Sequence, residues 1–463
     1  MEKKRLIQVD NLRQYFPVKK SSFLQKEQFY VKANDGITID IAEGETYGLV
    51  GESGCGKSTL GRVLLQLYVQ SRGDTIYYGR DVYQYQPKYY AKDLGRLSSL
   101  KDKYKKALDK CEAHKEDDKN HQYHDAVRRE FNHLCRLCGA FALEDNLANY
   151  ATVLQEEYKA GCKVADLIAK SASDTEIANA KKAHDEVKAK IAEMKRPLEN
   201  KERYQEAEEL WEHGIDLTRL TKEEMRILRE DLQIIFQDPY SSLNPKLTVG
   251  QIISEPLVGQ KKFKKGSKEL EEYIMKVMND CGLESYFIHR YPHQFSGGQR
   301  QRIGIARALA LNPKFIVCDE AVSALDVSIQ SQVLNLLQEL KEKQGLTYLF
   351  ISHDLSVVKY ISDRIGVMYL GNMVEAAPAE DIFTHPQHPY TEALLNAIPT
   401  TDVEHKELQI LEGDIPSPVN PPHGCKFHTR CKYAMERCKS EVPRWQEVRP
   451  DHFVACHLKD EEK

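Results

Sequence analysis

The most specific chemistry in this chain lies at residues 51–58, which read Gly-Glu-Ser-Gly-Cys-Gly-Lys-Ser. Glycines at this spacing let the backbone wrap closely around phosphate groups, so that its N–H groups point inward. We expect Lys57 to reach the β- and γ-phosphates of a nucleoside triphosphate and the Ser58 hydroxyl to bind Mg²⁺. The residues expected to bind nucleotide here are Gly51, Ser53, Gly54, Cys55, Gly56, Lys57, Ser58 and Thr59.

The flanks of this P-loop (residues 51–58) support the prediction. Residues 46–50 are apolar and β-prone, and residues 58–68 carry apolar side chains at helical spacing. A strand, a glycine turn and a helix in this order form the context in which the motif binds phosphate. The start of the helix adds its positive dipole end to the loop.

Three further apolar strands end in polar residues that suit phosphate hydrolysis. Gln237 follows one strand and can approach Mg²⁺ and the attacking water, although alone it is a weak signal. Asp319 and Glu320 follow another, where Asp319 suits Mg²⁺ coordination and Glu320 suits polarising the water. His353 follows the third and can hydrogen-bond a γ-phosphate. A lone histidine there is more often structural, and the order of the motifs favours the site.

A second helix start offers N–H donors to phosphate. Ser296, Gly297, Gly298 and Gln299 precede a helix that runs through Leu309. Two such helix starts in one chain indicate two phosphate-binding surfaces.

Two aromatic residues precede the P-loop by about one antiparallel ribbon. Phe29 and Tyr30 are placed to stack on an adenine, and they are equally compatible with packing inside a sheet.

Residues 84–215, called the insertion below, have a different character. They are rich in Lys and Glu, and no proline occurs between Pro87 and Pro197. The sequences on either side would join naturally, so we predict an inserted helical hairpin or small bundle. Its narrow apolar seam is predicted to consist of Ile177, Ala180, Ala183, Val187, Ile191 and Met194.

Cysteines in the insertion leave two readings open. Cys135 and Cys138 form a C-x-x-C with histidines nearby, which is compatible with zinc. Cysteines three apart on a helix also serve as small buried apolar residues.

The bulk composition suits a globular protein without membrane spans. The chain has 463 residues and a formal net charge of −4, so no global signal points to nucleic acid. No run of 18 apolar residues occurs, and no apolar segment follows the basic N-terminus, so we expect neither a transmembrane helix nor a signal peptide.

Four cysteines gather near the C-terminus: Cys425, Cys431, Cys438 and Cys456. In a reducing compartment, four thiolates within this short span suit Zn²⁺ or an iron–sulfur cluster, and the alternative is four unrelated buried thiols.

The order of these motifs resembles the ATPase domain of an ABC transporter, and the Ser296–Gln299 stretch is the most specific element of the resemblance. It implies an α/β P-loop NTPase (RecA-like) core, formed by residues 1–83 and 216–380, with an antiparallel β subdomain and an α-helical signature subdomain. It also implies a head-to-tail dimer in which ATP and Mg²⁺ lie between the P-loop of one subunit and the Ser-Gly-Gly signature of the other.

The C-terminal extension (residues 381–463) resembles that of oligopeptide/dipeptide importer ATPases, in which the motif G-C-x-F-x-x-R-C is associated with a [4Fe-4S] cluster. The resemblance implies a cytoplasmic, peripheral membrane location. The implied partners are a second ATPase subunit, two transmembrane permeases and an extracytoplasmic peptide-binding protein, with no nucleic acid and with membrane contact only through the permeases. Nickel or glutathione import is an alternative, and a soluble ABC ATPase acting on ribosomes or DNA is a more distant one. The insertion departs from the family pattern, and we expect it to be a docking or regulatory arm.

Overall fold

The computed structural model describes residues 4–20, 27–114, 120–397 and 413–460. These residues form two compact units, each of which is described by itself. Unit 1 contains residues 12–72 and 225–463, and unit 2 contains residues 6–11 and 73–224. Strand β1 (Arg5–Pro17) and helix α9 (Lys222–Leu228) pass from one unit to the other along the chain.

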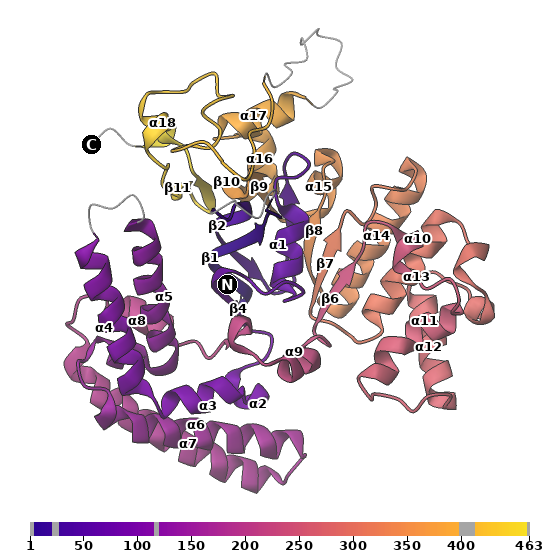
Figure 1. Ribbon diagram of the computed structural model, residues 1–463. Coiled ribbons are helices and arrows are strands. Elements are labelled where there is room, and N and C mark those ends of the chain that lie inside the picture. The colour runs from indigo at the N-terminus through magenta and orange to yellow at the C-terminus, as the bar shows by residue number, and fades with distance from the viewer. Residues whose placement is uncertain (1–3, 21–26, 115–119, 398–412, 461–463) are drawn as a thin grey trace. The chain divides into compact units, whose positions relative to one another are not determined.

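Unit 1 is built on an eight-stranded sheet with the order β11-β12-β10-β9-β3-β8-β7-β6 (Figure 1). Its strands are β3 (Thr46–Val50), β6 (Leu232–Ile235), β7 (Phe315–Asp319), β8 (Thr347–Ile351), β9 (Arg364–Tyr369), β10 (Asn372–Pro378), β11 (Gln446–Arg449) and β12 (His452–Val454). The neighbours from β9 through β6 pair in parallel, and β10, β12 and β11 continue antiparallel. All residues of β3, β7 and β8 are buried, which explains their continuous apolar sequences. The predicted α/β core is therefore confirmed.

Helices pack around this sheet, and strand β2 (Tyr30–Ala42) runs beside β1. The helices of unit 1 are α1 (Lys57–Leu64), α10 (Pro239–Ser242), α11 (Val249–Gly259), α12 (Lys268–Asp280), α13 (Gly297–Leu309), α14 (Val327–Gln344), α15 (Leu355–Ile361), α16 (Ala379–Thr384), α17 (Pro389–Asn396) and α18 (Arg437–Ser440). Helices α10 to α13 contact one another and form the helical part of the unit, which carries the Ser-Gly-Gly signature at the start of α13.

The C-terminal extension is joined to the sheet through a buried carboxylate. Glu375 on β10 is fully buried, and it accepts hydrogen bonds from the backbone N–H groups of Gln387 (2.6 Å) and His388 (2.9 Å). His452 on β12 is also fully buried and lies 2.7 Å from Glu375 Oε1 through its Nε2 atom. These contacts hold the last strands in register with the core sheet.

Unit 2 is a helical body next to a short ribbon in which β4 (Arg72–Tyr77) lies between β1 and β5 (Ile215–Asp216). Its helices are α2 (Val82–Tyr85), α3 (Lys88–Leu94), α4 (Leu97–Ala113), α5 (Asn120–Cys138), α6 (Ala148–Ala169), α7 (Asp174–Lys195) and α8 (Tyr204–Glu209). Two helical hairpins, α4 with α5 and α6 with α7, make up most of the body (Figure 1). The Val82 N–H donates to the His213 carbonyl at 3.0 Å, so the chain leaves and re-enters the ribbon at neighbouring points.

The insertion is bonded to the ribbon of its own unit through buried charges. Asp74 on β4 is 2% exposed, and its Oδ2 atom accepts from Arg136 Nη1 on α5 at 2.8 Å. Asp10 on β1 pairs with Arg128 at 2.6 Å and accepts from Asn132 at 2.9 Å. A buried carboxylate is tolerated only when it is paired in this way. The helices and the ribbon therefore form one body.

The predicted apolar seam of α7 is only partly correct. Ala180 and Ile191 are buried as expected, but Ala183 and Met194 are exposed, and His184 and Lys195 are buried in their place. His184 lies 2.7 Å from the buried Glu157 of α6. This polar pair is buried where the apolar spacing predicted burial of the neighbouring Ala183. Lys195 pairs with Glu208 at 2.7 Å and lies 3.3 Å from the centre of the Trp211 ring, which makes its burial tolerable.

Candidate functional site

The P-loop connects β3 to α1 and depends on two close backbone approaches. Gly51 has φ +147°, and a Cβ there would lie 2.1 Å from the Met368 carbonyl oxygen. Gly56 has φ +104°, and a Cβ there would lie 2.1 Å from the Ala33 carbonyl oxygen of β2. The Asn34 side chain, which sequence reasoning missed, donates to the Gly56 carbonyl at 3.1 Å. The loop is therefore a close-packed backbone structure that only glycine permits at these two positions.

The charged end of Lys57 lies within the P-loop itself. Its Nζ atom donates to the carbonyl oxygens of Gly51 (2.7 Å) and Glu52 (3.1 Å) and lies 3.7 Å from the Cys55 sulfur. Burial raises the pKa of the Cys55 thiol, so this residue is neutral and contributes to the site through its backbone.

A magnesium-type donor set is formed by β7 and α1. Ser58 Oγ donates to Asp319 Oδ1 at 2.5 Å, and Asp319 is 3% exposed. A hydroxyl and a carboxylate oxygen are ligands that Mg²⁺ prefers, so these residues fit the ion. Arg62, one turn along α1 from Ser58, donates to Asp319 Oδ2 at 3.3 Å. Sequence reasoning missed Arg62, although its i+4 spacing from Ser58 was a usable signal.

The three polar residues that end β6, β7 and β8 meet at one point. Gln237 Nε2 donates to Glu320 Oε2 at 2.7 Å, and His353 Nδ1 lies 3.6 Å from the same oxygen. Glu320 has φ +49°, which is uncommon for a residue with a side chain. The structure therefore brings Gln237, Glu320 and His353 together, at the same sheet edge where Asp319 contacts Ser58.

The Ser-Gly-Gly signature begins α13 and faces solvent. Ser296 Oγ accepts from the Gln299 N–H at 3.3 Å, and Gln299 Oε1 accepts from the Ser296 N–H at 3.1 Å. This capping box defines the first turn of the helix. Ser296 and Gly297 are exposed, whereas Gly298 is buried over Ile329.

The aromatic residues upstream of the P-loop are exposed. Phe29 is 49% exposed and Tyr30 is 44% exposed, and Tyr30 begins β2, the strand that passes Gly56 at Ala33. Packing inside a sheet is therefore wrong for these two rings. Stacking on an adenine stays a prediction.

The four C-terminal cysteines lie in one small region but do not form a metal site in this structure. Burial raises the pKa of both Cys425 and Cys456 to about 11, and the thiols of Cys431 and Cys438 act on Cys456 electrostatically. Within residues 4–20, 27–114, 120–397 and 413–460, no group of three or more Cys, His, Asp or Glu side chains is arranged to hold a metal ion. In the positions described, the four thiols are therefore not grouped for metal binding.

The C-x-x-C of the insertion is apolar packing. Cys135 and Cys138 are fully buried in α5, and the Cys138 sulfur donates to the Leu134 carbonyl at 3.1 Å. Burial raises the pKa of Cys138 to about 12, which opposes the thiolate that a metal requires.

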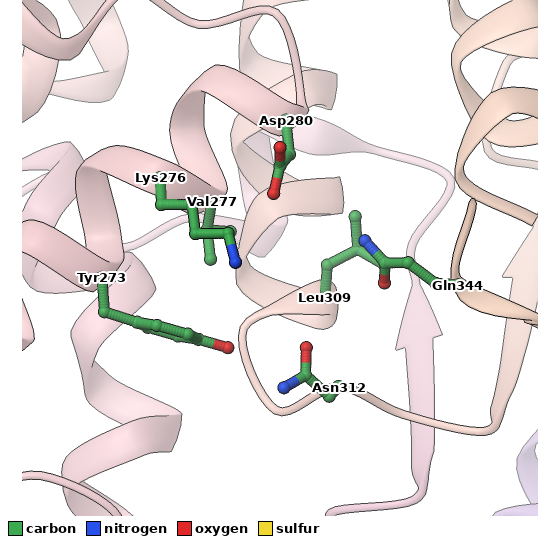
Figure 2. Close-up of a pocket in the computed structure, with 7 residues that line it drawn as sticks. All are labelled: Tyr273, Lys276, Val277, Asp280, Leu309, Asn312 and Gln344. Atoms are coloured by element: carbon green, nitrogen blue, oxygen red, sulfur yellow. The ribbon is translucent and has the colours of Figure 1, made fainter.

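A small cavity of about 190 Å³ lies beside α12 and the ends of α13 and α14 (Figure 2). It is lined by Tyr273, Lys276, Val277, Asp280, Leu309, Asn312 and Gln344. Its lining contains none of the predicted site residues.

Family comparisons agree with this geometry. A family described as "ABC transporter" matches residues 34–196 and 196–323, and one described as "Oligopeptide/dipeptide transporter, C-terminal region" matches residues 374–438.

Relatives align along almost the whole chain. The oligopeptide transport ATP-binding protein AppF of Bacillus subtilis is 35% identical over 457 residues, which covers 98% of this chain and 97% of that protein. The putative oligopeptide transport ATP-binding protein YkfD of Bacillus subtilis is 37% identical over 461 residues, which covers 99% of this chain and 97% of that protein. A putative peptide import ATP-binding protein of Brucella ovis is 55% identical over 248 residues, which covers 52% of this chain and 76% of that protein.

Among solved structures, the ATP-binding cassette MJ0796, a dimer bound to ADP and Pi, matches with a TM-score of 0.46 and 18% identity. The match covers 81% of this chain and 99% of that chain.

Two glycines of the P-loop provide a matched pair of alanine substitutions. Both need positive φ, but Gly56→Ala must also displace the Ala33 carbonyl, whereas a Cβ at Gly54 meets no atom within 4 Å. Both variants pay about 1–3 kcal/mol of backbone strain. We expect Gly56→Ala to raise the Kd for Mg·ATP by a further factor of about ten or more over Gly54→Ala. Isothermal titration calorimetry measures this, and equal Kd values would contradict the close-packing account.

Proposed function

Because the chain belongs to the ABC transporter family, we propose that it is the ATP-hydrolysing subunit of an importer of oligopeptides and dipeptides. The observation that carries this proposal is the meeting of Gln237, Glu320 and His353 at the strand edge next to Ser58 and Asp319. The printed names of its full-length relatives and the match of residues 374–438 support peptides as the cargo.

The chain's own residues divide the chemistry among them. The backbone of the P-loop binds the phosphates, and Lys57 leaves the carbonyls of Gly51 and Glu52 to contact the β- and γ-phosphates. Ser58, Asp319 and Gln237 would hold Mg²⁺, and Arg62 contacts the same Asp319 carboxylate. When bound, the ion neutralises charge on the phosphate oxygens.

Glu320 polarises the attacking water, and its carboxylate is held by Gln237 at one oxygen. His353, whose Nδ1 atom lies 3.6 Å from the same Glu320 oxygen, hydrogen-bonds the γ-phosphate. Tyr30 stacks on the adenine, which its exposure permits.

One chain contributes half of each catalytic site in this proposal. The exposed Ser296 and Gly297, together with Gly298 and Gln299, contact the nucleotide held by a partner's P-loop. Helix N-terminal N–H groups suit phosphate binding. The partner is a second ATPase subunit, and the two chains form a head-to-tail dimer.

The motion of the dimer is passed to two transmembrane permease subunits through residues 237–244. Tyr240 in this stretch is 66% exposed, which supports an interface there. No helix in the described parts of the chain is long and apolar enough to cross a membrane. We place the subunit at the cytoplasmic face of the membrane. The permeases receive peptide at the opposite face, from an extracytoplasmic binding protein.

Two smaller parts of the proposal concern the remaining segments. The C-terminal cysteines Cys425, Cys431, Cys438 and Cys456 bind an iron–sulfur cluster, which requires their side chains to move closer than they are here. The insertion docks another component of the transporter. Its attachment to the ribbon through Asp74 and Asp10 supports a rigid docking body.

Glu320→Gln tests the transport function. Removing the carboxylate should lower ATP hydrolysis by at least about 100-fold while leaving ATP binding intact. Glu339→Gln is the matched control, because Glu339 is an exposed residue of α14 paired with Lys343.

Cells lacking the chain are assayed for uptake of labelled dipeptides and tetrapeptides, with nickel and glutathione in parallel. Peptide uptake restored by the wild type and Glu339→Gln, but not by Glu320→Gln, is the expected result. Restored uptake of nickel or glutathione instead would contradict the peptide assignment.

Iron and sulfide analysis tests the cysteine cluster. Protein purified without oxygen should contain about four iron and four sulfide per chain and lose them in Cys456→Ser. Cys318→Ser is the control, because Cys318 is a fully buried thiol of β7. Zinc, or no metal at all, would refute the iron–sulfur assignment.

Deletion of residues 84–212 tests the insertion. Keeping His213 preserves its hydrogen bond with Val82, and adding Asp74→Asn removes the carboxylate that would lose Arg136. The full-length Asp74→Asn chain is the control. We expect the deletion to bind Mg·ATP normally and to lose assembly with the transporter, measured by co-purification. Normal assembly and peptide uptake would rule out a docking role.

A further inference from the structure

The second residue of the P-loop is held from outside the loop. The Glu52 backbone N–H donates to the Tyr390 hydroxyl at 2.9 Å, and its carbonyl accepts from Lys57 Nζ at 3.1 Å. Its carboxylate receives two hydrogen bonds from Arg430, at 2.8 Å from Nη1 to Oε2 and at 3.0 Å from Nη2 to Oε1. Both Tyr390 and Arg430 belong to the C-terminal extension.

The contact between Arg430 and Glu52 has the geometry of a strong ion pair. Two parallel N–H···O bonds from a guanidinium fix the orientation of a carboxylate as well as its position. The Arg430 side chain is 4% exposed and the Glu52 side chain is 22% exposed, so solvent reaches the pair from the Glu52 side only. Fully exposed ion pairs contribute little, whereas this pair is half-buried.

An aromatic cluster holds Arg430 in place. Phe427 is 2% exposed, and its ring packs against Tyr369 (5.2 Å between centres) and Tyr390 (5.3 Å). The Arg430 N–H donates to the Phe427 carbonyl at 3.0 Å. The same cluster therefore positions both groups that reach Glu52, namely the Arg430 guanidinium and the Tyr390 hydroxyl.

A second ion pair attaches the same turn of the extension to the core. Lys426 donates to Asp35 Oδ2 at 3.0 Å and to the Leu370 carbonyl at 3.2 Å. Asp35 follows Asn34, whose side chain donates to the Gly56 carbonyl at the other end of the P-loop. The extension is thus connected to both ends of the loop.

We propose that Arg430 is a positioning residue for the nucleotide site, which makes ATP affinity depend on the C-terminal extension. This inference rests on the proposed binding of ATP at the P-loop. Arg430 neutralises the carboxylate of Glu52, which otherwise places a negative charge in the loop that receives the triphosphate. It also fixes the Glu52 carbonyl that faces Lys57. Loss of Arg430 alone leaves this carboxylate unpaired next to the phosphates and weakens binding.

The test is equilibrium binding of Mg·ATP to the full chain. Arg430→Gln should raise the Kd by about tenfold or more, because it leaves the Glu52 carboxylate without its paired cation. Arg437→Gln is the matched control, since Arg437 pairs with Glu441 and Asp460 inside the extension. It should leave the Kd unchanged. Arg430→Lys, which keeps the charge but loses the two-pronged geometry, should fall between the wild type and Arg430→Gln.

The double variant Glu52→Gln with Arg430→Gln distinguishes an effect of the unpaired Glu52 charge on ATP affinity from a general loss of stability. Removing both charges should return the Kd to within about threefold of the wild type, although the extension has lost the ion pair. Because the double variant leaves no unpaired charge, it is informative even where Arg430→Gln alone fails to fold.

Two results would overturn this inference and leave the proposed nucleotide site intact. One is a Kd for Arg430→Gln equal to that of Arg437→Gln, and the other is a double variant that binds Mg·ATP as weakly as Arg430→Gln. Failure of the wild type to bind ATP, or undiminished binding in Lys57→Ala, would overturn the proposed nucleotide site and this inference together.

Discussion

Parallel pairing of β3, β8, β7 and β6 is the constraint on which the candidate site depends. Parallel strands present their carboxyl ends at one edge, so the residues that follow them are collected there although they are far apart in the chain. The P-loop follows β3, Asp319 and Glu320 end β7, and His353 follows β8. These strands are buried on both faces and pair in parallel register, so the polar residues that follow them emerge together at this edge.

Paired carboxylates join the insertion to the ribbon of unit 2 and the C-terminal extension to the sheet and P-loop of unit 1. Asp74 accepts a hydrogen bond from Arg136 of the insertion, and Glu375 lies within 2.7 Å of His452 of the extension. Glu52 forms an ion pair with Arg430. Replacing such a pair by apolar residues is often neutral for stability, whereas losing one partner is costly. Pairs of this kind therefore specify where a segment docks more than they stabilise the fold. In this chain they join accessory segments to particular strands and, at Glu52, to the nucleotide loop.

The features that were predicted from sequence are those whose chemistry is local. The P-loop, the Ser-Gly-Gly helix start and the acidic end of β7 each act through neighbouring residues and backbone geometry, so their spacing alone identifies them. The α/β core was predictable because buried parallel strands must be continuously apolar. The four C-terminal cysteines were recognised by spacing as well, but spacing does not set the distances between side chains, and in the described part of the chain these thiols are not arranged to hold a metal ion.

Contacts that join distant parts of the chain were decided only by the tertiary structure. Arg430, the partner of Glu52, lies 378 residues away in the sequence. The residues around either position give no indication that the two side chains pair. On α7, apolar spacing selected Ala183 and Met194, but Glu157 of the neighbouring helix made burial of His184 favourable instead. The sequence determined the nucleotide loop, the strands and the order of the motifs, because these follow from local backbone preference and apolar burial. The structure decided which charges are paired, because a buried charge is tolerated only where folding supplies its partner.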